Sequence, residues 1–267
     1  MLRKGIRLRE PETGEFNGIR FRLYPDSHSA SAVVYFNGYI EYDSMRFVER
    51  LLQPGNRFVD VGANIGVYAC LAAKIVGSSG HVHAFEPNPK VYERLLENIR
   101  LNGYENVTST CAAVGAADGY TRLIETENDS LGRISENTAE MDRSSSDTRL
   151  VTLDSTIEER IDLVKIDVEG AEPLVLEGMK RQLHGKDPPV VLCELDGYSK
   201  RYGYDTDRVI GLLRESGCRI YKYDGSANVL QATDRPWELS VQRANVVAAR
   251  PERLEGLCRS AGINLIE

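Results

Sequence analysis

The alternation of apolar and polar positions predicts two extended segments and a helix at the start of the chain. Residues 19–24 alternate as a half-buried strand does, and residues 31–40 have the composition of a second extended segment. A helix is expected to begin near Asp43, because apolar residues follow it at helical spacing, and to end at Pro54-Gly55. Residues 1–53 are therefore interpreted as an N-terminal extension, made of a small β-hairpin and a helix, that would cover the cofactor or substrate or contact a second copy.

Beyond this extension, short apolar strands alternate with helical segments, and residues 54–267 are interpreted as one domain. Strands are expected at 58–61, 81–85, 107–114, 163–167 and 190–194, and helices at 67–76, 89–102, 172–183 and 205–216. This alternation is typical of an α/β fold with a parallel sheet covered on both faces. Two later strands, 218–223 and 245–249, are expected to pair antiparallel at one edge. The polar stretch 125–149 is interpreted as a long loop.

Charge and cysteine content narrow the classes of partner. Lys and Arg number 33 against 40 Asp and Glu, giving a net charge of -7, so neither nucleic acid nor a membrane surface is the expected partner. The five cysteines are far apart and form no Cys-x-x-Cys pair, which favours buried reduced thiols over a zinc or redox site. With no apolar segment typical of a signal peptide near the first residues, a cytoplasmic location is expected.

The most informative segment is Asp60-Val61-Gly62-Ala63-Asn64-Ile65-Gly66, which links a predicted strand to a predicted helix. Open α/β sheets bind nucleotides at this place, and the helix N-terminus is expected to offer unpaired N–H groups. The glycine pattern of a dinucleotide site is absent, because Asn64 and Val67 stand where its second and third glycines would be. This absence counts against the alternative of an NAD-dependent oxidoreductase.

Two carboxylates indicate which nucleotide this site would take. Asp60 ends the first strand of this unit, where it could hold a cationic amine, and Glu86 ends the second strand, where it could bind two ribose hydroxyls. A ligand with an ammonium group and a ribose but no pyrophosphate is S-adenosylmethionine. The sequence therefore favours this cofactor.

At these residues the chain resembles the FkbM-type S-adenosylmethionine-dependent methyltransferases. The resemblance runs from about residue 57 to 194, with Gly178 and Glu194 near its end. It is carried by the Asp60–Gly66 run, by Ala84-Phe85-Glu86-Pro87, by Leu153-Asp154 and by Val164-Lys165-Ile166-Asp167-Val168-Glu169-Gly170-Ala171-Glu172. The last run is its most specific part.

The resemblance implies a Rossmann-like, seven-stranded, mostly parallel sheet with an antiparallel last strand. It also implies O-methylation of a hydroxyl on a sugar or natural-product small molecule. Carried over by position, Cys111-Ala112-Ala113 would lie near the adenine. The cofactor-binding residues would be Asp60, Gly62, Ala63, Asn64, Gly66, Glu86, Pro87, Ala112 and Ala113.

The reaction would need a base for the acceptor hydroxyl, and the carboxylates after the fourth strand are candidates. Asp167, Glu169 and Lys165 are the expected catalytic residues, although Asp167 could merely pair with Lys165 and Glu169 could merely begin a helix. A divalent metal is a second hypothesis, because Glu194 and Asp196 close the neighbouring strand and would bring further oxygens; no metal ligand is assigned.

Other questions stay open at this level. A non-catalytic domain that binds S-adenosylmethionine and acts through a partner is an alternative to the enzyme. The identity of the acceptor and a possible homodimer are not fixed by the sequence. Tyr39-Ile40-Glu41 directly precedes the cofactor domain and could fold over the cofactor.

Overall fold

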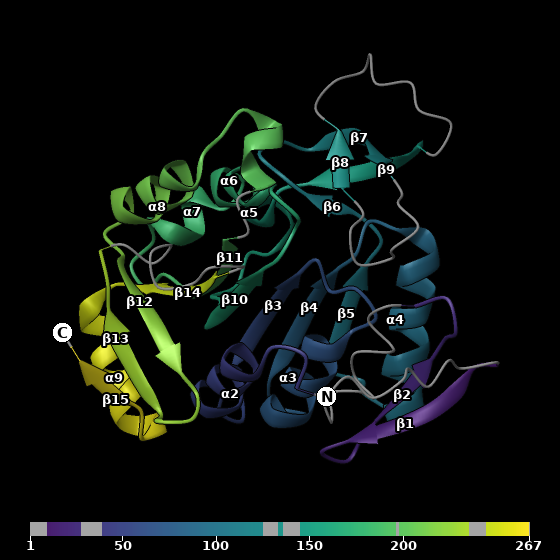
Figure 1. Cartoon of the computed structure of the whole chain (residues 1–267), viewed down its shortest axis with the longest axis horizontal. Helices are drawn as coiled ribbons and strands as arrows, with labels where there is room; N and C mark the ends of the chain where they lie inside the picture. Colours follow the sequence, from purple (N-terminus) through teal and green to yellow (C-terminus); the bar gives the residue numbers. More distant parts are fainter. Residues whose placement is uncertain are drawn as a thin grey trace, which may run out of the picture.

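A mixed β-sheet forms the centre of the molecule (Figure 1). The computed structural model describes residues 10–27, 39–124, 133–135, 145–195, 198–234 and 244–266. Within these ranges the sheet has nine strands in the order β5-β4-β3-β10-β11-β14-β12-β13-β15. Their bounds are β3 Arg57–Val61, β4 His81–Phe85, β5 Val107–Thr110, β10 Leu163–Ile166, β11 Val190–Leu195, β12 Arg219–Asp224, β13 Val229–Ala232, β14 Ala244–Ala249 and β15 Asn264–Ile266.

The first seven strands of this order have the arrangement that the family resemblance implied. Strands β5, β4, β3, β10 and β11 are parallel, and β14 pairs antiparallel with both β11 and β12. The expected pairing of the two late strands is therefore confirmed. Its expected position at the edge is wrong, because β13 pairs with β12 and β15 extends the sheet further.

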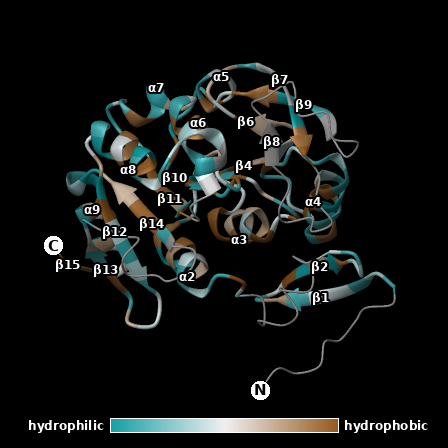
Figure 2. Cartoon of the chain, turned by 45° about the horizontal axis from the view of Figure 1, so that its top comes forward, coloured by the Kyte–Doolittle hydropathy of each residue, from teal (hydrophilic) through white to brown (hydrophobic). Residues whose placement is uncertain are grey.

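Helices cover both faces of the sheet, and strand residues alternate between two apolar cores. Phe58, Leu163 and Leu192 point to one core, whereas Val59 and Val164 point to the other. The first core is covered by α2 Tyr42–Leu51, α3 Val67–Val76, α4 Pro89–Asn102 and α9 Pro251–Ala261. The second is covered by α5 Leu153–Thr156, α6 Glu172–Glu177, α7 Lys180–Leu183 and α8 Thr206–Glu215. Figure 2 shows α3 as a largely hydrophobic helix at the centre of the fold.

Three boundaries differ from the sequence prediction. The strand expected at 107–114 ends at residue 110, and Ala113–Val114 form a separate strand, β6. Strand β6 belongs to a second sheet in the order β6-β9-β7-β8. The other strands of this sheet are β7 Gly119–Ile124, β8 Arg133–Ser135 and β9 Ser145–Val151. The expected loop 125–149 therefore contains β8 and the start of β9; its residues 125–132 and 136–144 lie outside the described ranges.

The helix expected at 172–183 divides into α6 and α7 at Gly178. A Cβ atom at Gly178 would lie 1.9 Å from the carbonyl oxygen of Gly115, so the two backbones are in contact there. A helix continuing with any larger residue would push β6 away. The 3₁₀ helix η1 Tyr198–Tyr202 follows β11.

The described N-terminal hairpin includes a strand that the sequence did not predict. Strand β2 Ile19–Leu23 pairs with β1 Glu12–Phe16, and Asn17 and Gly18 have φ values of 49° and 68° at the turn. This Asn-Gly pair is a strong hairpin signal that the sequence reading missed. Of the segment 31–40, residues 31–38 lie outside the described ranges.

The extension packs into the same core as the sheet. Phe21 of β2 and Phe47 of α2 are fully buried in the first core. The side-chain oxygen of Asn98 on α4 accepts the N–H of Arg22, and its amide nitrogen donates to the carbonyl of Ile65, with distances of 2.7 and 2.8 Å. Asn98 therefore ties the hairpin to the glycine loop.

All five cysteines lie in described ranges and are free thiols, as the sequence predicted; four are buried and Cys111 is partly exposed. Burial raises the pKa of the Cys70 thiol to about 12, so this thiol is unreactive at neutral pH. No helix in the described ranges combines the length and the apolar composition that crossing a bilayer requires.

Candidate active site

The register of the sheet gathers polar side chains on one face, near the carboxyl ends of the strands. Asp60 on β3 is the neighbour of Lys165 on β10, and Glu194 on β11 is the neighbour of Asn245 on β14. In each strand these residues alternate with apolar residues of the second core, so they point to the face covered by α2 and α3.

The loop between β3 and α3 is bonded within the protein. The N–H groups of Gly62 and Ala63 both donate to the carbonyl of Phe85, at 3.0 and 2.9 Å. The N–H of Asn64 donates to Glu86 Oε2 at 2.9 Å. The N–H of Ile65 donates to Asn64 Oδ1 at 2.8 Å, and that of Gly66 to the carbonyl of Ala63 at 2.8 Å.

The N–H groups of residues 62–66 are therefore used within the protein, and the expectation of unpaired N–H groups, which concerned the N-terminus of α3, stays a prediction. The glycines have another purpose. A Cβ at Gly62, whose φ is 81°, would lie 1.9 Å from the backbone oxygen of Asp167, and a Cβ at Gly66 would lie 2.5 Å from Leu95 Cδ1. The two glycines let the loop contact β10 on one side and α4 on the other.

Asp60 is a buried carboxylate without a hydrogen-bond partner in the described structure. Its side chain is 1% exposed, and neither oxygen has a partner at normal hydrogen-bond geometry. Burial raises the pKa of Asp60 to about 6, even though the Lys165 ammonium and the nearby N–H of Ala69 lower it. An unpaired buried carboxylate is costly, and a cationic ligand group would compensate it.

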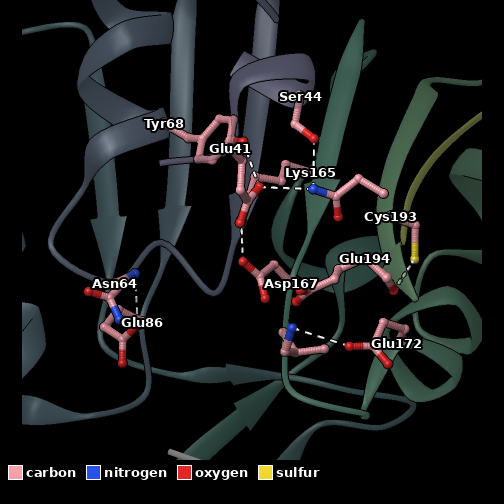
Figure 3. Close-up of polar contacts among 12 residues, drawn as sticks. Glu41, Ser44, Asn64, Tyr68, Glu86, Lys165, Asp167, Glu172, Cys193 and Glu194 are labelled. Atoms are coloured by element: carbon pink, nitrogen blue, oxygen red, sulfur yellow. Dashed lines mark hydrogen bonds and ion pairs between the residues drawn. The ribbon is translucent and has the colours of Figure 1, made fainter. Parts of the chain in front are cut away.

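Glu86 is fixed at the end of β4 by backbone donors. Besides the N–H of Asn64, its carboxylate accepts the N–H of Asn88 at 2.9 Å, and the side chain is 7% exposed. Its place at the end of the second strand of the unit is where an acidic residue meets ribose hydroxyls in such sheets, so this role stays a prediction. Figure 3 shows Asn64 and Glu86 side by side, away from the other labelled acidic residues.

The residues expected near the adenine lie next to this edge of the site. Pro87 is partly exposed, and its carbonyl accepts the hydroxyl of Thr148 at 3.2 Å. Ala112 and Ala113 are buried in two different apolar clusters, so an adenine could meet their backbone or the partly exposed Cys111 beside them. Their contact with a cofactor stays a prediction.

Lys165 and Asp167 form an ion pair in the middle of the site. The Lys165 ammonium lies 2.8 Å from Asp167 Oδ2 and 4.6 Å from the centre of the Tyr68 ring. Burial lowers the pKa of Lys165, but the carboxylates of Asp167, Asp60 and Glu41 outweigh it, so the net shift is upward and the ammonium stays charged. The Asp167 side chain is 24% exposed, whereas that of Lys165 is 6% exposed. The pairing therefore exists and still leaves Asp167 accessible.

Glu169 and Glu172 have different surroundings. Glu169 has a φ of 53° in the turn that follows β10 and is 6% exposed, and it lies outside α6, so it is not a helix-start residue. Glu172 accepts the N–H groups of Val168 and Gly170 at 3.3 and 3.0 Å, which fixes that turn. These contacts give Glu172 a structural role.

One oxygen each from Asp167, Glu169 and Glu194 lies within 4.8 Å of the other two, among the residues that the structure describes. Hard cations take such ligands, but acidic side chains also gather without an ion, and Asp167 already contacts an ammonium. We therefore treat the three as carboxylates and not as metal ligands. Asp196 lies outside the described residues.

The structure adds four residues that the sequence did not assign to the catalytic residues: Glu41, Ser44, Tyr68 and Asn245. Glu41 Oε2 accepts the hydroxyl of Tyr68 at 2.8 Å and the amide nitrogen of Asn245 at 2.9 Å. Asn245 also donates to the Ser44 hydroxyl at 2.7 Å. Figure 3 shows Glu41, Ser44 and Tyr68 above Asp167. The sequence suggested only that Glu41 could cover the cofactor, and the polar Asn245 at the start of an apolar strand was the other available signal.

Comparison with known proteins identifies the family of the chain. The model of the Methyltransferase FkbM domain matches residues 60–220. The hexuronic acid methyltransferase AglP of Haloferax volcanii is 28% identical over 192 residues, covering 66% of this chain and 69% of that protein. The crystal structure of an FkbM methyltransferase from Methylobacillus flagellatus superposes with a TM-score of 0.50 at 16% identity, covering 82% of this chain and 53% of that chain, and shows the same fold.

A shorter match is to the protein-L-isoaspartate O-methyltransferase of Ignicoccus hospitalis, 39% identical over 57 residues, which are 21% of this chain and 27% of that protein. The chain thus spans about a quarter of the length of the first curated relatives that it matches. The FkbM match covers more than half of the chain and includes the loop, Glu86, Lys165, Asp167 and Glu194. The cofactor of this domain is S-adenosylmethionine, and the chain belongs to the FkbM methyltransferase family.

Proposed function

We propose that this protein transfers a methyl group from S-adenosylmethionine to a hydroxyl group of a sugar or a similar small molecule. The observation that carries the proposal is the position of Asp167. It is partly exposed at the carboxyl end of β10, next to the loop that begins at Asp60. A carboxylate there is within reach of both the expected cofactor site and an acceptor that enters from solvent.

The residues present fit the cofactor. Asp60 offers a buried carboxylate whose oxygens have no hydrogen bond at normal geometry, which suits an ammonium group. Glu86 is held by two backbone N–H groups at the neighbouring strand end and can accept ribose hydroxyls. When bound, S-adenosylmethionine supplies a methyl group that is already activated on a sulfonium.

The protein then has two tasks, positioning and proton removal. Lys165 donates to one oxygen of Asp167, and the carboxylate is partly exposed, so an acceptor that enters from solvent can approach it. Asp167 takes the hydroxyl proton as the oxygen attacks in line, and positioning supplies most of the rate. Lys165 is thus expected to orient the base, and Glu169 and Glu194 to line the acceptor side.

The charge of the site favours a neutral acceptor group. Asp167 is surrounded by the carboxylates of Glu41, Asp60, Glu169 and Glu194. An acceptor carboxylate placed there would meet like charges, whereas a hydroxyl would not. AglP is a hexuronic acid methyltransferase by name, and a hexuronic acid offers both groups. We infer that here the hydroxyl is methylated and an ether is formed.

The test uses S-adenosylmethionine labelled in the methyl group and three acceptors: a hexuronic acid, a neutral hexose and an amino sugar. Labelled product that survives mild alkali supports ether formation, whereas label released by alkali identifies a methyl ester and refutes the hydroxyl as acceptor group. Binding of S-adenosylhomocysteine without transfer to any acceptor would favour the non-catalytic alternative. An Asp167→Asn variant should lower kcat by about 100-fold or more while binding S-adenosylhomocysteine as the wild type does.

A further inference from the structure

Glu41 brings the N-terminal extension to the centre of the site. It directly precedes α2, outside the segment that matches the family model. Its Oε2 is held by Tyr68 from α3 and by Asn245 from β14. Figure 3 shows the carboxyl group next to the Asp167 side chain. Two donors from two different elements thus fix the position of this carboxyl group, and they fix it beside the expected base.

The ion pair with Lys165 creates a difficulty for Asp167 as a base. An ammonium at 2.8 Å favours the charged form of a carboxylate and makes it a weak proton acceptor. Proton removal from a hydroxyl needs the opposite. A second carboxylate next to Asp167 restores basicity, because two like charges close together disfavour the state in which both are ionised.

Several charged or titratable groups surround Asp167. Glu41 is the member of this group that comes from the N-terminal extension. The others are Lys165 on β10, Asp60 on β3, Tyr68 on α3, Glu169 in the turn after β10 and Glu194 on β11. Burial raises the pKa of Glu41, and the Asp167 charge raises it further, while Lys165, Tyr68 and Asn245 lower it. The influence of one carboxylate on the other is necessarily mutual.

We propose that Glu41 is a positioning residue of the acceptor site, whose carboxylate offsets the Lys165 ammonium and keeps Asp167 basic enough to take the acceptor proton. This inference rests on the proposed function. In the step, the hydroxyl proton goes to Asp167 and an O–CH₃ bond forms as the S–CH₃ bond breaks. The electron pair of that bond stays on sulfur, which leaves S-adenosylhomocysteine, and the proton is released to solvent afterwards.

The first experiment follows the carboxyl groups by ¹³C NMR over a pH titration of the full chain, and it needs no acceptor. The Asp167 signal is assigned from its loss in Asp167→Asn. In Glu41→Gln we expect the titration midpoint of Asp167 to fall by about one pH unit. The matched control is Glu49→Gln: Glu49 lies on α2 and bonds to Tyr39 and Arg46. An Asp167 midpoint that is the same in Glu41→Gln and wild type overturns the proposal.

The second measurement uses an acceptor found in the labelled-methyl assay. For Glu41→Gln we expect kcat to fall about tenfold and its acidic limb to move to lower pH, with unchanged affinity for S-adenosylhomocysteine. In Glu41→Asp, which keeps the charge, the titration midpoint of Asp167 should stay close to the wild-type value. This variant replaces Glu41→Gln in the test if Glu41→Gln does not fold. Lost cofactor affinity with unchanged midpoints would assign Glu41 to the cofactor and refute the proposal. Absence of turnover in the wild type would refute the proposed function while the NMR comparison still decides the role of Glu41.

Discussion

The two sides of the site are built in opposite ways. On the cofactor side, the N–H groups of residues 62–66 all have protein partners, and Glu86 is held by two of the surrounding backbone donors. On the acceptor side, the Lys165 ammonium faces the carboxylates of Glu41, Asp60 and Asp167, so negative charge is in excess. The first side has its backbone hydrogen bonds made within the protein, whereas the second gathers charges whose burial is costly.

This difference shows where stability and chemistry separate. A loop with saturated hydrogen bonds gives the cofactor a fixed shape and needs no ligand to fold. A group of buried carboxylates destabilises the folded state. Its negative charge is compensated when a cationic ligand group binds or when a carboxylate takes a proton during the reaction. Asp60 belongs to both sides, because it ends β3 at the loop and neighbours Lys165.

The largest expected effect comes from the backbone contact that joins the two sides. Gly62→Ala would place a methyl group 1.9 Å from the Asp167 oxygen at a φ of 81°, so the loop or β10 must move. We expect a loss of at least about 4 kcal/mol of unfolding free energy by urea denaturation. Gly103→Ala is the control, with a φ of 66° and no atom within 4 Å, and should cost about 1 kcal/mol. Equal losses would show that the contact does not matter.

The second effect concerns the charge balance of the acceptor side. Lys165→Met removes the ammonium that faces Glu41, Asp60 and Asp167 and leaves their buried charges uncompensated. We expect the unfolding free energy at pH 8 to fall by about 3 kcal/mol. The loss should shrink on acidification, as the carboxylates become neutral. A loss independent of pH would mean that Lys165 acts through packing against Tyr68 and not through its charge.

The same contrast explains how much the sequence could predict. The strand–helix–strand unit from Asp60 to Glu86 is contiguous in the chain. Its glycines and the acidic residues at its strand ends were therefore enough to predict the fold and the cofactor-binding residues. Tyr68 and Asn245 had no local signature, because their role depends on contacts between distant segments. Glu41 and Asn245, for example, are separated by 204 positions in the chain. Only the register of the sheet and the position of α2 bring them together.

The third effect is a pH dependence of stability that belongs to Asp60. Burial raises its pKa from 3.8 to about 6 in the folded apoprotein, so the folded state keeps a proton that the unfolded chain has released. The contribution of this group to stability is complete below about pH 4 and is lost as the pH rises through about 6, a loss between about 1 and 3 kcal/mol. Asp60→Asn should therefore be more stable than wild type at pH 7.5 and equal to it at pH 4. A less stable variant at pH 7.5 would contradict this explanation.

The smallest expected effect separates the two sides by ligand affinity. Asp60→Asn should weaken S-adenosylhomocysteine about tenfold by calorimetry, because it removes the carboxylate that would hold the ammonium. Glu194→Gln, which changes the acceptor side, should leave the affinity within about twofold. Wild-type affinity should also fall as the pH drops below about 6, where Asp60 is protonated, and the Asn variant should lack that decline. If Glu194→Gln weakened the ligand as much as Asp60→Asn, the two sides would form one binding site, and the saturated loop would not act apart from the carboxylates.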